Sequence, residues 1–517
     1  MSTIINKIKN TEKIDFRKIY SKISNVEKAA FITVMVLGLL THIFMFVNVL
    51  PNWDSMYNFK GDKIWIHMGR WFLNESQKLS SIVDIPWVIG MLSLVFIGIT
   101  CAIIVNVLEI KKMSSAIAIS AIIVTFPVVT STFSYMFLAD GYMMGMMLSA
   151  LAVFITKKYK RGYIVAGAIL AFAIGIYQVN LGFAVLLSLL VIMLKVFNKD
   201  EDIVDNIKYA MRFVIMALIG MVLYFIILKV FIFILHRGLG SYQGADQGFS
   251  INKQSILNIL TEFKNLPKVV TGGYDASFSS LILLLFVFAG IMLLYLIKLN
   301  KIYKDILKLI LVLVALVSIP FITGFAYFIS EGTAYHMVMR MSWSLLFVAI
   351  ITLNEKISIK KGINNLLQQI VYSLPLVITW IIIWNFILVA NISYLNMHQR
   401  YEKEYSLAVR VVDRLEMSEE YNPSTPILFA GSPYTHNTPG NYSEYIGHVT
   451  GTDGNSIFFS DYHFNQFIKY YIGLNLNSVS DKKANEIMNS EEYKSMKSFP
   501  NKECIKKIDD VVVVKFS

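Results

Sequence analysis

The chain has 517 residues, of which 56% are hydrophobic and only 16% are charged, and its mean hydropathy is +0.57. A soluble protein would carry closer to a quarter charged residues, so the composition excludes an ordinary soluble fold. The net charge of +12 does not indicate nucleic-acid binding, because the basic excess lies in short loops between apolar runs.

Long apolar runs recur from about residue 29 to about residue 392. Each is close to the roughly 20 residues that span a bilayer, and backbone groups in lipid must be satisfied internally, so these runs are predicted helices. The connections at 133–135 and 177–178 are so short that each could hide a broken or re-entrant helix. The roughly eleven predicted spans are 29–50, 86–108, 115–132, 136–156, 163–177, 178–197, 211–236, 278–297, 306–328, 338–353 and 370–392.

The distribution of basic residues predicts the orientation of these spans. The opposite loops 133–135, 177–178 and 329–337 carry no Lys or Arg. The N-terminus is therefore predicted to be cytoplasmic and the C-terminal tail extracytoplasmic. The residues placed on the cytoplasmic side are Lys111, Lys112, Lys157, Lys158, Lys160, Arg161, Lys298, Lys301, Lys304, Lys356, Lys360 and Lys361.

The chain divides into a basic cytoplasmic segment (1–28), a membrane domain (29–392) and an extracytoplasmic domain (393–517). The first span is too long for a signal-peptide core and no small-residue cleavage site follows it, which favours a signal anchor. Cys101 in a span and Cys504 in the tail cannot pair on this topology.

Three extracytoplasmic segments are large: 51–85, about 237–277, and the tail. The tail pattern predicts a helix at 398–417, further helices near 462–472 and 481–491, and strands at Pro426–Ala430 and Val511–Phe516. The predicted fold class is thus an all-α polytopic membrane protein with a small extracytoplasmic α/β C-terminal domain.

The first extracytoplasmic loop carries a helical pattern between residues 57 and 80. Basic and polar side chains share one face and apolar side chains another, which predicts an amphipathic helix in the membrane interface. The alternative is a scaffold helix anchored by aromatic and basic residues. The polar face consists of Lys63, His67, Arg70, Asn74 and Lys78.

Two carboxylates are candidates for catalysis. Asp54 follows the end of span one by four residues, and there a partly desolvated carboxylate could act as a general base; the alternative is an ordinary loop acid. Asp140 lies just inside span four, and ionisable residues within spans are functional candidates by default. Asp62 has the same chemistry, but Gly61-Asp62 is more typical of a turn or an N-cap.

Further candidate residues are predicted to lie at the same outer level of the membrane. Tyr177 and Gln178 occupy the apex between two tightly linked spans, where an interfacial aromatic belt is the alternative interpretation. His336 and Arg340 are four residues apart and, with Glu331, form a charged cluster. The arginine could hold a phosphate in bidentate fashion, or it could simply snorkel.

The combination is more informative than any single residue, because these side chains all fall at the outer level of the membrane. An acid and several phosphate-holding groups would meet a lipid-linked substrate there. No metal-ligand spacing stands out, so we expect no metal and no other cofactor. The set consists of Asp54, Asp140, His67, Arg70, Tyr177, Gln178, His336 and Arg340.

Several short motifs occur in a characteristic order: Asn52-x-Asp54, Gly69-Arg70-Trp71, Asp140-Gly141-Tyr142, Gly175-Ile176-Tyr177-Gln178, His336 with Arg340, and the segment 396–414. In this order the chain resembles the bacterial O-antigen-type glucosyltransferases (Gtr type II), which have a GT-C-like membrane fold. The resemblance covers most of the membrane region and the start of the tail.

The resemblance implies transfer of a sugar, usually glucose, from a polyprenyl-phosphate donor to a cell-surface polysaccharide or teichoic-acid-like acceptor on the outer face. It implies that Asp54 is the candidate base, that Arg70 and Arg340 bind the donor phosphate, and that Asp140, Tyr177 and Gln178 lie near the cleft. Many members carry an acidic pair where this chain has only Asp54. The identity of the base among the carboxylates therefore stays open.

Two other functions are considered. A lipid-linked-sugar flippase or transporter would show charged residues or paired broken helices near the bilayer midplane, and only Lys229 in span seven fits that description. An inactive scaffold would need no converging Asp and Arg residues. In the tail, segment 431–463 is dense in Tyr, Asn, Gly, Ser and Thr, which suits polysaccharide binding but is also ordinary loop composition.

Overall fold

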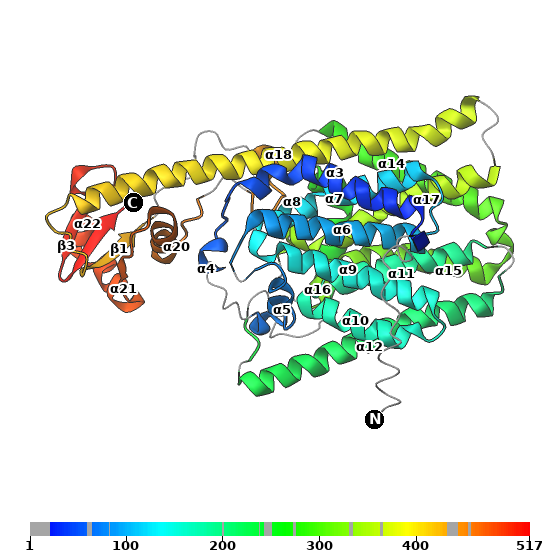
Figure 1. The fold of residues 1–517 in the computed structure, drawn as a ribbon, viewed down its shortest axis with the longest axis horizontal. Coiled ribbons are helices and arrows are strands. Elements are labelled where there is room, and N and C mark those ends of the chain that lie inside the picture. Colours follow the sequence, from blue (N-terminus) through cyan, green and yellow to red (C-terminus); the bar gives the residue numbers. More distant parts are fainter. Residues whose placement is uncertain are drawn as a thin grey trace, which may run out of the picture.

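The computed structural model describes residues 21–58, 65–81, 83–198, 201–236, 238–241, 251–271, 276–329, 334–361, 366–431, 443–452 and 456–517. The predictions for residues 1–20, for Asp62, Lys63 and Glu331, and for the parts 432–442 and 453–455 of segment 431–463 lie outside these residues. A bundle of helices occupies one end of the molecule and a small sheet the other (Figure 1). We call the end of the bundle nearest the sheet the tail-side end.

Within the described residues, eight helices are long and apolar enough to cross a membrane. One of the eight is the broken pair α7–α8. The eight are α3 (Asn25–Val47), α6 (Pro86–Val107), α7 (Met113–Thr125) with α8 (Pro127–Ser134), α9 (Met136–Lys158), α12 (Ile203–Leu235), α14 (Ala276–Leu299), α15 (Ile306–Thr323) and α18 (Leu366–Glu416).

The other three predicted spans coincide with helices that do not meet this length and hydropathy. Two of them, α10 (Gly162–Ile176) and α11 (Asn180–Val196), are apolar but short. At 1.5 Å per residue they reach about 22 and 25 Å, less than a 30 Å hydrocarbon core. The third, α17 (Ser344–Lys361), starts later than residue 338 and ends in a charged stretch. The count of eleven spans is thus not confirmed.

The predicted span 115–132 is broken in the structure. Helix α7 ends at Thr125, and Pro127 is the first residue of α8. Proline is tolerated at the first position of a helix but cannot continue one, so the break falls at the sequence Phe126-Pro127. Almost every side chain of α7 and α8 is buried, which places the pair inside the bundle.

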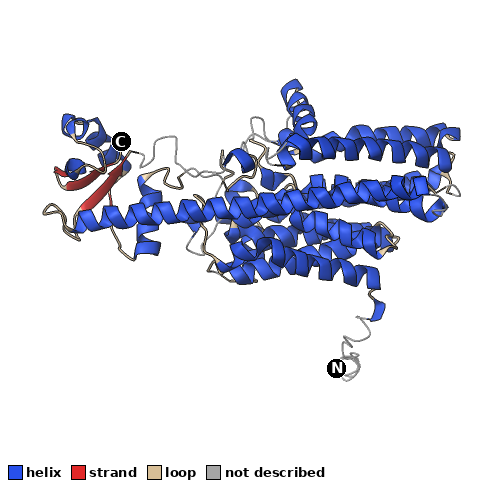
Figure 2. Cartoon of the chain, turned by 90° about the horizontal axis from the view of Figure 1, so that it is seen from above, coloured by secondary structure: helices blue, strands red, loops and turns tan. Residues whose placement is uncertain are grey.

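The largest difference from prediction concerns α18, which is a single helix of 51 residues. Two helices were expected, with a connection between 392 and 398. That connection contains neither glycine nor proline, so nothing interrupts the backbone hydrogen bonds. Its inward face is buried at Tyr394 and Met397, and the Asn396 side chain donates to the carbonyl of Thr452 at 2.7 Å. Figures 1 and 2 show α18 running from the bundle to the sheet.

The amphipathic helix predicted over 57–80 is wrong. The described part contains only α4 (Ser55–Asn58), the turn η1 (Ile66–Met68) and α5 (Leu73–Gln77). Gly69 has a φ of +73°, a left-handed conformation that ends a helix. Arg70 therefore lies in a turn. Ser76 and Gln77 of α5 are buried, and the Gln77 amide donates to the carbonyl of Phe137.

One amphipathic helix was not predicted. Helix α13 (Lys253–Val270) lies in the Gly-, Ser- and Gln-rich segment, and the Asn252 side chain caps its first turn by accepting from Ser255 N at 2.8 Å. Its buried face includes Ile259 and Leu266 and packs near α14, α15 and α16 (Ala326–Ile329). The turns η4 (Met337–Met339) and η5 (Met341–Trp343) precede α17, and η3 (Ile302–Lys304) joins α14 to α15.

The tail contains a four-stranded sheet of order β2-β1-β4-β3. β1 (Pro426–Ala430) pairs in parallel with β2 (Asn477–Ser478) and with β4 (Val511–Lys515), and β3 (Ile505–Ile508) pairs antiparallel with β4. Two of these strands were predicted. Their side chains alternate between two cores: one packs against α18 and α20 (Asp461–Phe467), the other against α21 (Asp481–Asn489).

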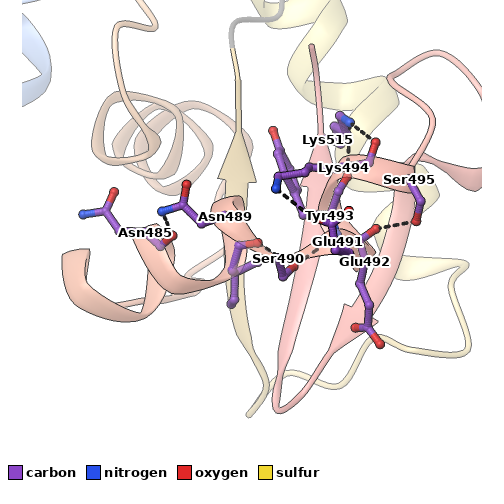
Figure 3. A network of polar contacts seen from close by, with 10 residues as sticks. Asn485, Asn489, Ser490, Glu491, Glu492, Tyr493, Lys494, Ser495 and Lys515 are labelled. Carbon is purple, nitrogen blue, oxygen red and sulfur yellow. Dashed lines mark hydrogen bonds and ion pairs between the residues drawn. The ribbon is translucent and has the colours of Figure 1, made fainter.

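Short helices complete the tail: α19 (Ser443–Ile446), the π-turn η6 (Ile468–Ile472), α22 (Glu491–Ser495) and η7 (Lys502–Cys504). The ammonium group of Lys515 closes the end of α22, because it donates to the carbonyls of Tyr493, Lys494 and Met496 at 3.0–3.3 Å (Figure 3). This interaction satisfies carbonyl groups that a helix leaves unpaired at its C-terminus.

The continuity of α18 predicts a distance. Asn391 and Val409 are exposed and lie about five turns apart, so spin labels on them should be separated by about 27 Å along the axis. Double electron–electron resonance measures this separation after replacement of the buried Cys101 and Cys504 by serine. The matched control pair is Ile207 and Phe225 on α12, which are exposed and equally far apart in sequence. A distribution clearly shorter than that of the control would mean that α18 is bent near residue 395.

Candidate functional site

A pocket of about 550 Å³ lies at the tail-side end of the bundle. This volume is within the range of small-molecule sites. Its walls come from five separate parts of the chain: the loop after α3, the turn before α5, the start of α9, the α10–α11 apex, and the segment at η4. The lining residues are Trp53, Asp54, Tyr57, Asn58, Trp65, His67, Met68, Arg70, Tyr135, Phe137, Leu138, Tyr142, Tyr177, His336, Val338 and Met339.

The loop that carries Asp54 is held at both sides of this residue. The buried Asn52 accepts from the backbone N–H of Ser55 at 3.1 Å, and its amide donates to the carbonyl of Ser134 at 2.8 Å. On the other side, Met56 is 1% exposed and belongs to the core between α18, α20 and the sheet. The tail thus positions the backbone of Asp54.

The charge state of Asp54 is set by two opposing effects. Burial raises the pKa of this carboxyl above its usual value, because an ionised group is poorly solvated in the pocket wall. The positive charge of Arg70 acts in the opposite direction and favours the carboxylate. An acid with a raised pKa beside a cation is a typical candidate for proton transfer.

Arg70 packs against a pair of stacked tyrosines, Tyr142 and Tyr177. Its guanidinium donates to the Tyr142 hydroxyl at 2.8 Å, and its central carbon is 4.5 Å from the centre of the Tyr177 ring. The rings of Tyr142 and Tyr177 are stacked with their centres 4.4 Å apart. Cation–π contacts stabilise a guanidinium without neutralising its charge, so Arg70 can still bind an anion in the pocket.

The turn before Arg70 is positioned by side chains of the bundle. The Gln178 amide donates to the carbonyl of Met68 at 2.7 Å, and the Tyr224 hydroxyl donates to that of Gly69 at 3.0 Å. A methyl group at Gly69 would stand 2.6 Å from the Tyr224 oxygen. Gln178 therefore holds the turn and does not line the pocket.

Two histidines line the pocket, His67 from η1 and His336 from the residue before η4. Burial, and then the charge of Arg340, lower the pKa of His336 below its usual value. His336 is thus neutral near pH 7, where a neutral imidazole can still donate one hydrogen bond.

Arg340 is only 5% exposed and does not line the pocket. Its guanidinium forms an ion pair with Glu262 of α13 at 2.7 Å and donates to the carbonyl of Tyr335 at 2.6 Å. The rings of Tyr335 and Trp343 also lie 4.9 Å from it. Arg340 thus links the segment that carries His336 to α13. No sequence signal pointed to Glu262, because α13 was not predicted.

Asp140 is buried in α9 but does not line the pocket, although Phe137, Leu138 and Tyr142 of the same helix do. One Asp140 oxygen accepts from the backbone N–H of Gly141 at 2.8 Å.

Five of the eight candidates from the sequence therefore share one pocket: Asp54, His67, Arg70, Tyr177 and His336. Gln178, Arg340 and Asp140 lie outside it. The aromatic walls at Trp53, Tyr57 and Trp65 were not singled out, although the sequence placed tryptophans in this loop. Among the described residues no group of three or more His, Cys, Asp or Glu side chains is arranged to hold a metal ion.

Comparison with known proteins identifies the family. The family model described as Glucosyl transferase GtrII matches residues 43–353, which is more than half of the chain. No curated protein and no solved structure matches the chain. The chain belongs to the GtrII glucosyl transferases, and the matched range contains every residue that lines the pocket. It is a membrane protein of a glycosyltransferase family.

Gly69 provides a test of the turn. Gly69→Ala should reduce sugar transfer about tenfold or more, because a side chain at this φ costs about 1–3 kcal/mol and displaces Arg70. Gly290→Ala is the matched control, since nothing lies within 4 Å of a methyl group at this position in α14. Transfer activity and thermal stability should be measured for both purified variants. Full activity in Gly69→Ala would show that the turn geometry does not position the reacting groups.

Proposed function

We propose that this GtrII family member transfers a sugar, most simply glucose, from a polyprenyl-phosphate donor to a cell-surface polysaccharide at the extracytoplasmic face. The observation that carries the proposal is one pocket in which a partly buried carboxylate, Asp54, lies within the electrostatic reach of Arg70. A sugar phosphate needs a base on one side of its anomeric carbon and a cation on the other.

The proposed reaction is a displacement at the anomeric carbon. An acceptor hydroxyl oxygen attacks this carbon while Asp54 takes the hydroxyl proton. The bond between the anomeric carbon and the phosphate oxygen breaks, and the electron pair leaves with the polyprenyl phosphate. Within the described residues Asp54 is the only carboxylate that lines the pocket, which fits one general base and no covalent sugar–enzyme intermediate.

The phosphate that departs gains negative charge, and preorganised donors stabilise that charge. Arg70 is the proposed principal group, because Tyr142 and Tyr177 orient it without cancelling its charge. His67 and His336 are proposed to donate further hydrogen bonds. Arg340, Gln178 and Asp140 are proposed to act by positioning, since none of them reaches the pocket.

A site at this end of a helical bundle suits a lipid-linked donor, whose tail stays in lipid while its sugar reaches water. A GT-C-like arrangement, an extracytoplasmic tail, and the absence of a metal or other cofactor requirement are parts of this proposal. Lys229, the one residue that favoured a flippase or transporter, is better explained by its place near a helix end. Lys229 is exposed about two turns before the end of α12, where its amine can reach the interface.

Asp54 provides the catalytic test. Asp54→Asn keeps the size of the side chain but removes the proton acceptor, so we expect transfer to fall on the order of 10² or more. Radiolabelled polyprenyl-phosphate glucose and purified protein measure this. The control is Asp413→Asn, an exposed carboxylate on α18, which should keep full activity. Near-normal turnover in Asp54→Asn would show that Asp54 is not the base.

The pH dependence follows from the same group. Because Asp54 must be ionised to accept a proton, activity should rise with pH through its raised pKa. Arg70 opposes that rise in pKa, so Arg70→Gln should move the acidic limb of the profile to higher pH in the activity that remains. A limb that stays in place would show that this carboxyl does not control the rate.

The orientation is tested by labelling. Glu419 in the tail and Lys301 at the opposite end of the bundle are both exposed. In intact cells an impermeant maleimide should modify Glu419→Cys but reach Lys301→Cys only after lysis. The reverse pattern would place the pocket on the cytoplasmic side and remove the proposed acceptor.

A further inference from the structure

Three exposed aromatic side chains form a continuous surface beside the pocket, which we call the aromatic platform: Tyr57, Phe459 and Tyr462. Their exposed fractions are 55%, 63% and 42%. The rings of Tyr57 and Tyr462 are stacked with centres 4.9 Å apart and planes 14° apart. Two of the three residues belong to the tail and one to the loop after α3.

The tail part of this platform is rigidly held. One Asp461 oxygen accepts from the backbone N–H of Phe429 in β1 at 2.8 Å, and the other accepts from the Asn465 amide at 2.8 Å. Phe464 and Phe467, on the far side of α20, are buried in the core that also contains Met56. The platform is therefore a preformed surface, and ligand binding would not have to order it.

The platform is continuous with the pocket. Tyr57 lines the pocket and also stacks on Tyr462, and Trp53, another lining residue, contacts the Phe459 ring edge-on at 5.7 Å. Asp54 lies between Trp53 and Tyr57 in the chain, whereas Arg70 is placed by Tyr142 and Tyr177 of the bundle. Asp54 interacts electrostatically with both Arg70 and Tyr57, so the base is close to both the cation and the platform, where an acceptor hydroxyl must arrive.

The chemistry of the platform suits a carbohydrate. A pyranose ring presents a face of C–H bonds with partial positive charge, which packs on the negative face of an aromatic ring. Its hydroxyls point outward and stay in water or meet polar groups such as Ser460 and His463, which are hydrogen-bonded to each other at 2.8 Å. An anionic ligand would need cations, and the platform contains none.

We propose that the aromatic platform is the acceptor subsite, which holds one or more sugar rings of the polysaccharide so that a hydroxyl reaches Asp54. This inference rests on the proposed function and adds the part of the tail that selects the substrate. It assigns Tyr57, Phe459 and Tyr462 to acceptor binding and none of them to donor binding.

The test separates acceptor binding from donor chemistry. The double variant Phe459→Ala/Tyr462→Ala leaves every pocket-lining residue intact. With polyprenyl-phosphate glucose and the surface polysaccharide purified from the producing cells, its KM for the polysaccharide should rise about tenfold. The KM for the donor and the slow hydrolysis of the donor without polysaccharide should stay at wild-type values. The single variant Tyr462→Phe keeps the aromatic ring, so its KM for the polysaccharide should stay at the wild-type value.

Tyr405→Ala is the matched control, because Tyr405 is exposed to the same degree as Tyr462 but lies on α18. It should leave both KM values unchanged. An unaltered polysaccharide KM in the active double variant would overturn the subsite while leaving the proposed function intact. A wild-type protein that neither transfers nor hydrolyses the sugar of the donor would overturn the proposed function itself.

A second measurement distinguishes a carbohydrate surface from a membrane-contacting one. Phe459→Trp places a fluorescent ring in the platform of protein reconstituted in nanodiscs. Purified polysaccharide should change its emission, and brominated lipids should not quench it beyond the level of wild type. Strong quenching by brominated lipid with no response to polysaccharide would show that the rings insert into the bilayer and would overturn the proposal.

Discussion

The burial of Met56 in the core of the tail is the contact on which the rest of the site depends. The loop after α3 contains only one short helix, α4, and a helix of four residues is not stable alone. Its geometry must be imposed from outside. Removing a buried methionine side chain typically costs about 2–5 kcal/mol, enough to hold a short loop in one conformation. Because Asp54 is only two residues before Met56, the burial of Met56 also fixes the position of Asp54.

The opposite side of the pocket follows a different principle, because its groups are fixed by the bundle. Arg70 lies in a turn whose carbonyl groups accept hydrogen bonds from Gln178 and Tyr224, and its guanidinium packs against the stacked rings of Tyr142 and Tyr177. The segment that carries His336 is held to α13 by the Arg340–Glu262 ion pair, which is largely buried. A buried ion pair of this kind is weak evidence for stability but restricts geometry. Base and cation are thus carried by separately anchored segments that meet only in the folded chain.

This division matches the extent of the family match. Residues 43–353 contain the whole pocket, whereas α18 and the entire tail lie outside the match. The tail nevertheless supplies the core that receives Met56 and the rings that stack beside Tyr57. The matched region thus carries the groups proposed for donor chemistry together with Tyr57, and the unmatched region carries Phe459 and Tyr462, the other two residues proposed for acceptor recognition.

The sequence alone determined the properties that depend on local composition. Apolar length located the eight described helices that are long enough to cross a membrane, and strand-like runs located β1 and β4. Polar residues at the ends of the apolar runs indicated five members of one pocket. The sequence periodicity wrongly extended a helix through Gly69. This residue has a left-handed φ, and the Tyr224 and Gln178 side chains that lie against it come from distant parts of the chain.

Only the tertiary structure decided which polar groups converge. The sequence predicted Arg340 as a phosphate ligand, but in the structure it is paired with Glu262 from an unpredicted helix, and Asp140 does not line the pocket. The sequence did not indicate the role of Met56, because a single methionine in a loop does not reveal what it packs against. Its partners in the core begin about 350 residues later in the chain. Contacts across such separations leave no periodicity in the sequence, and they are what placed the base beside the cation.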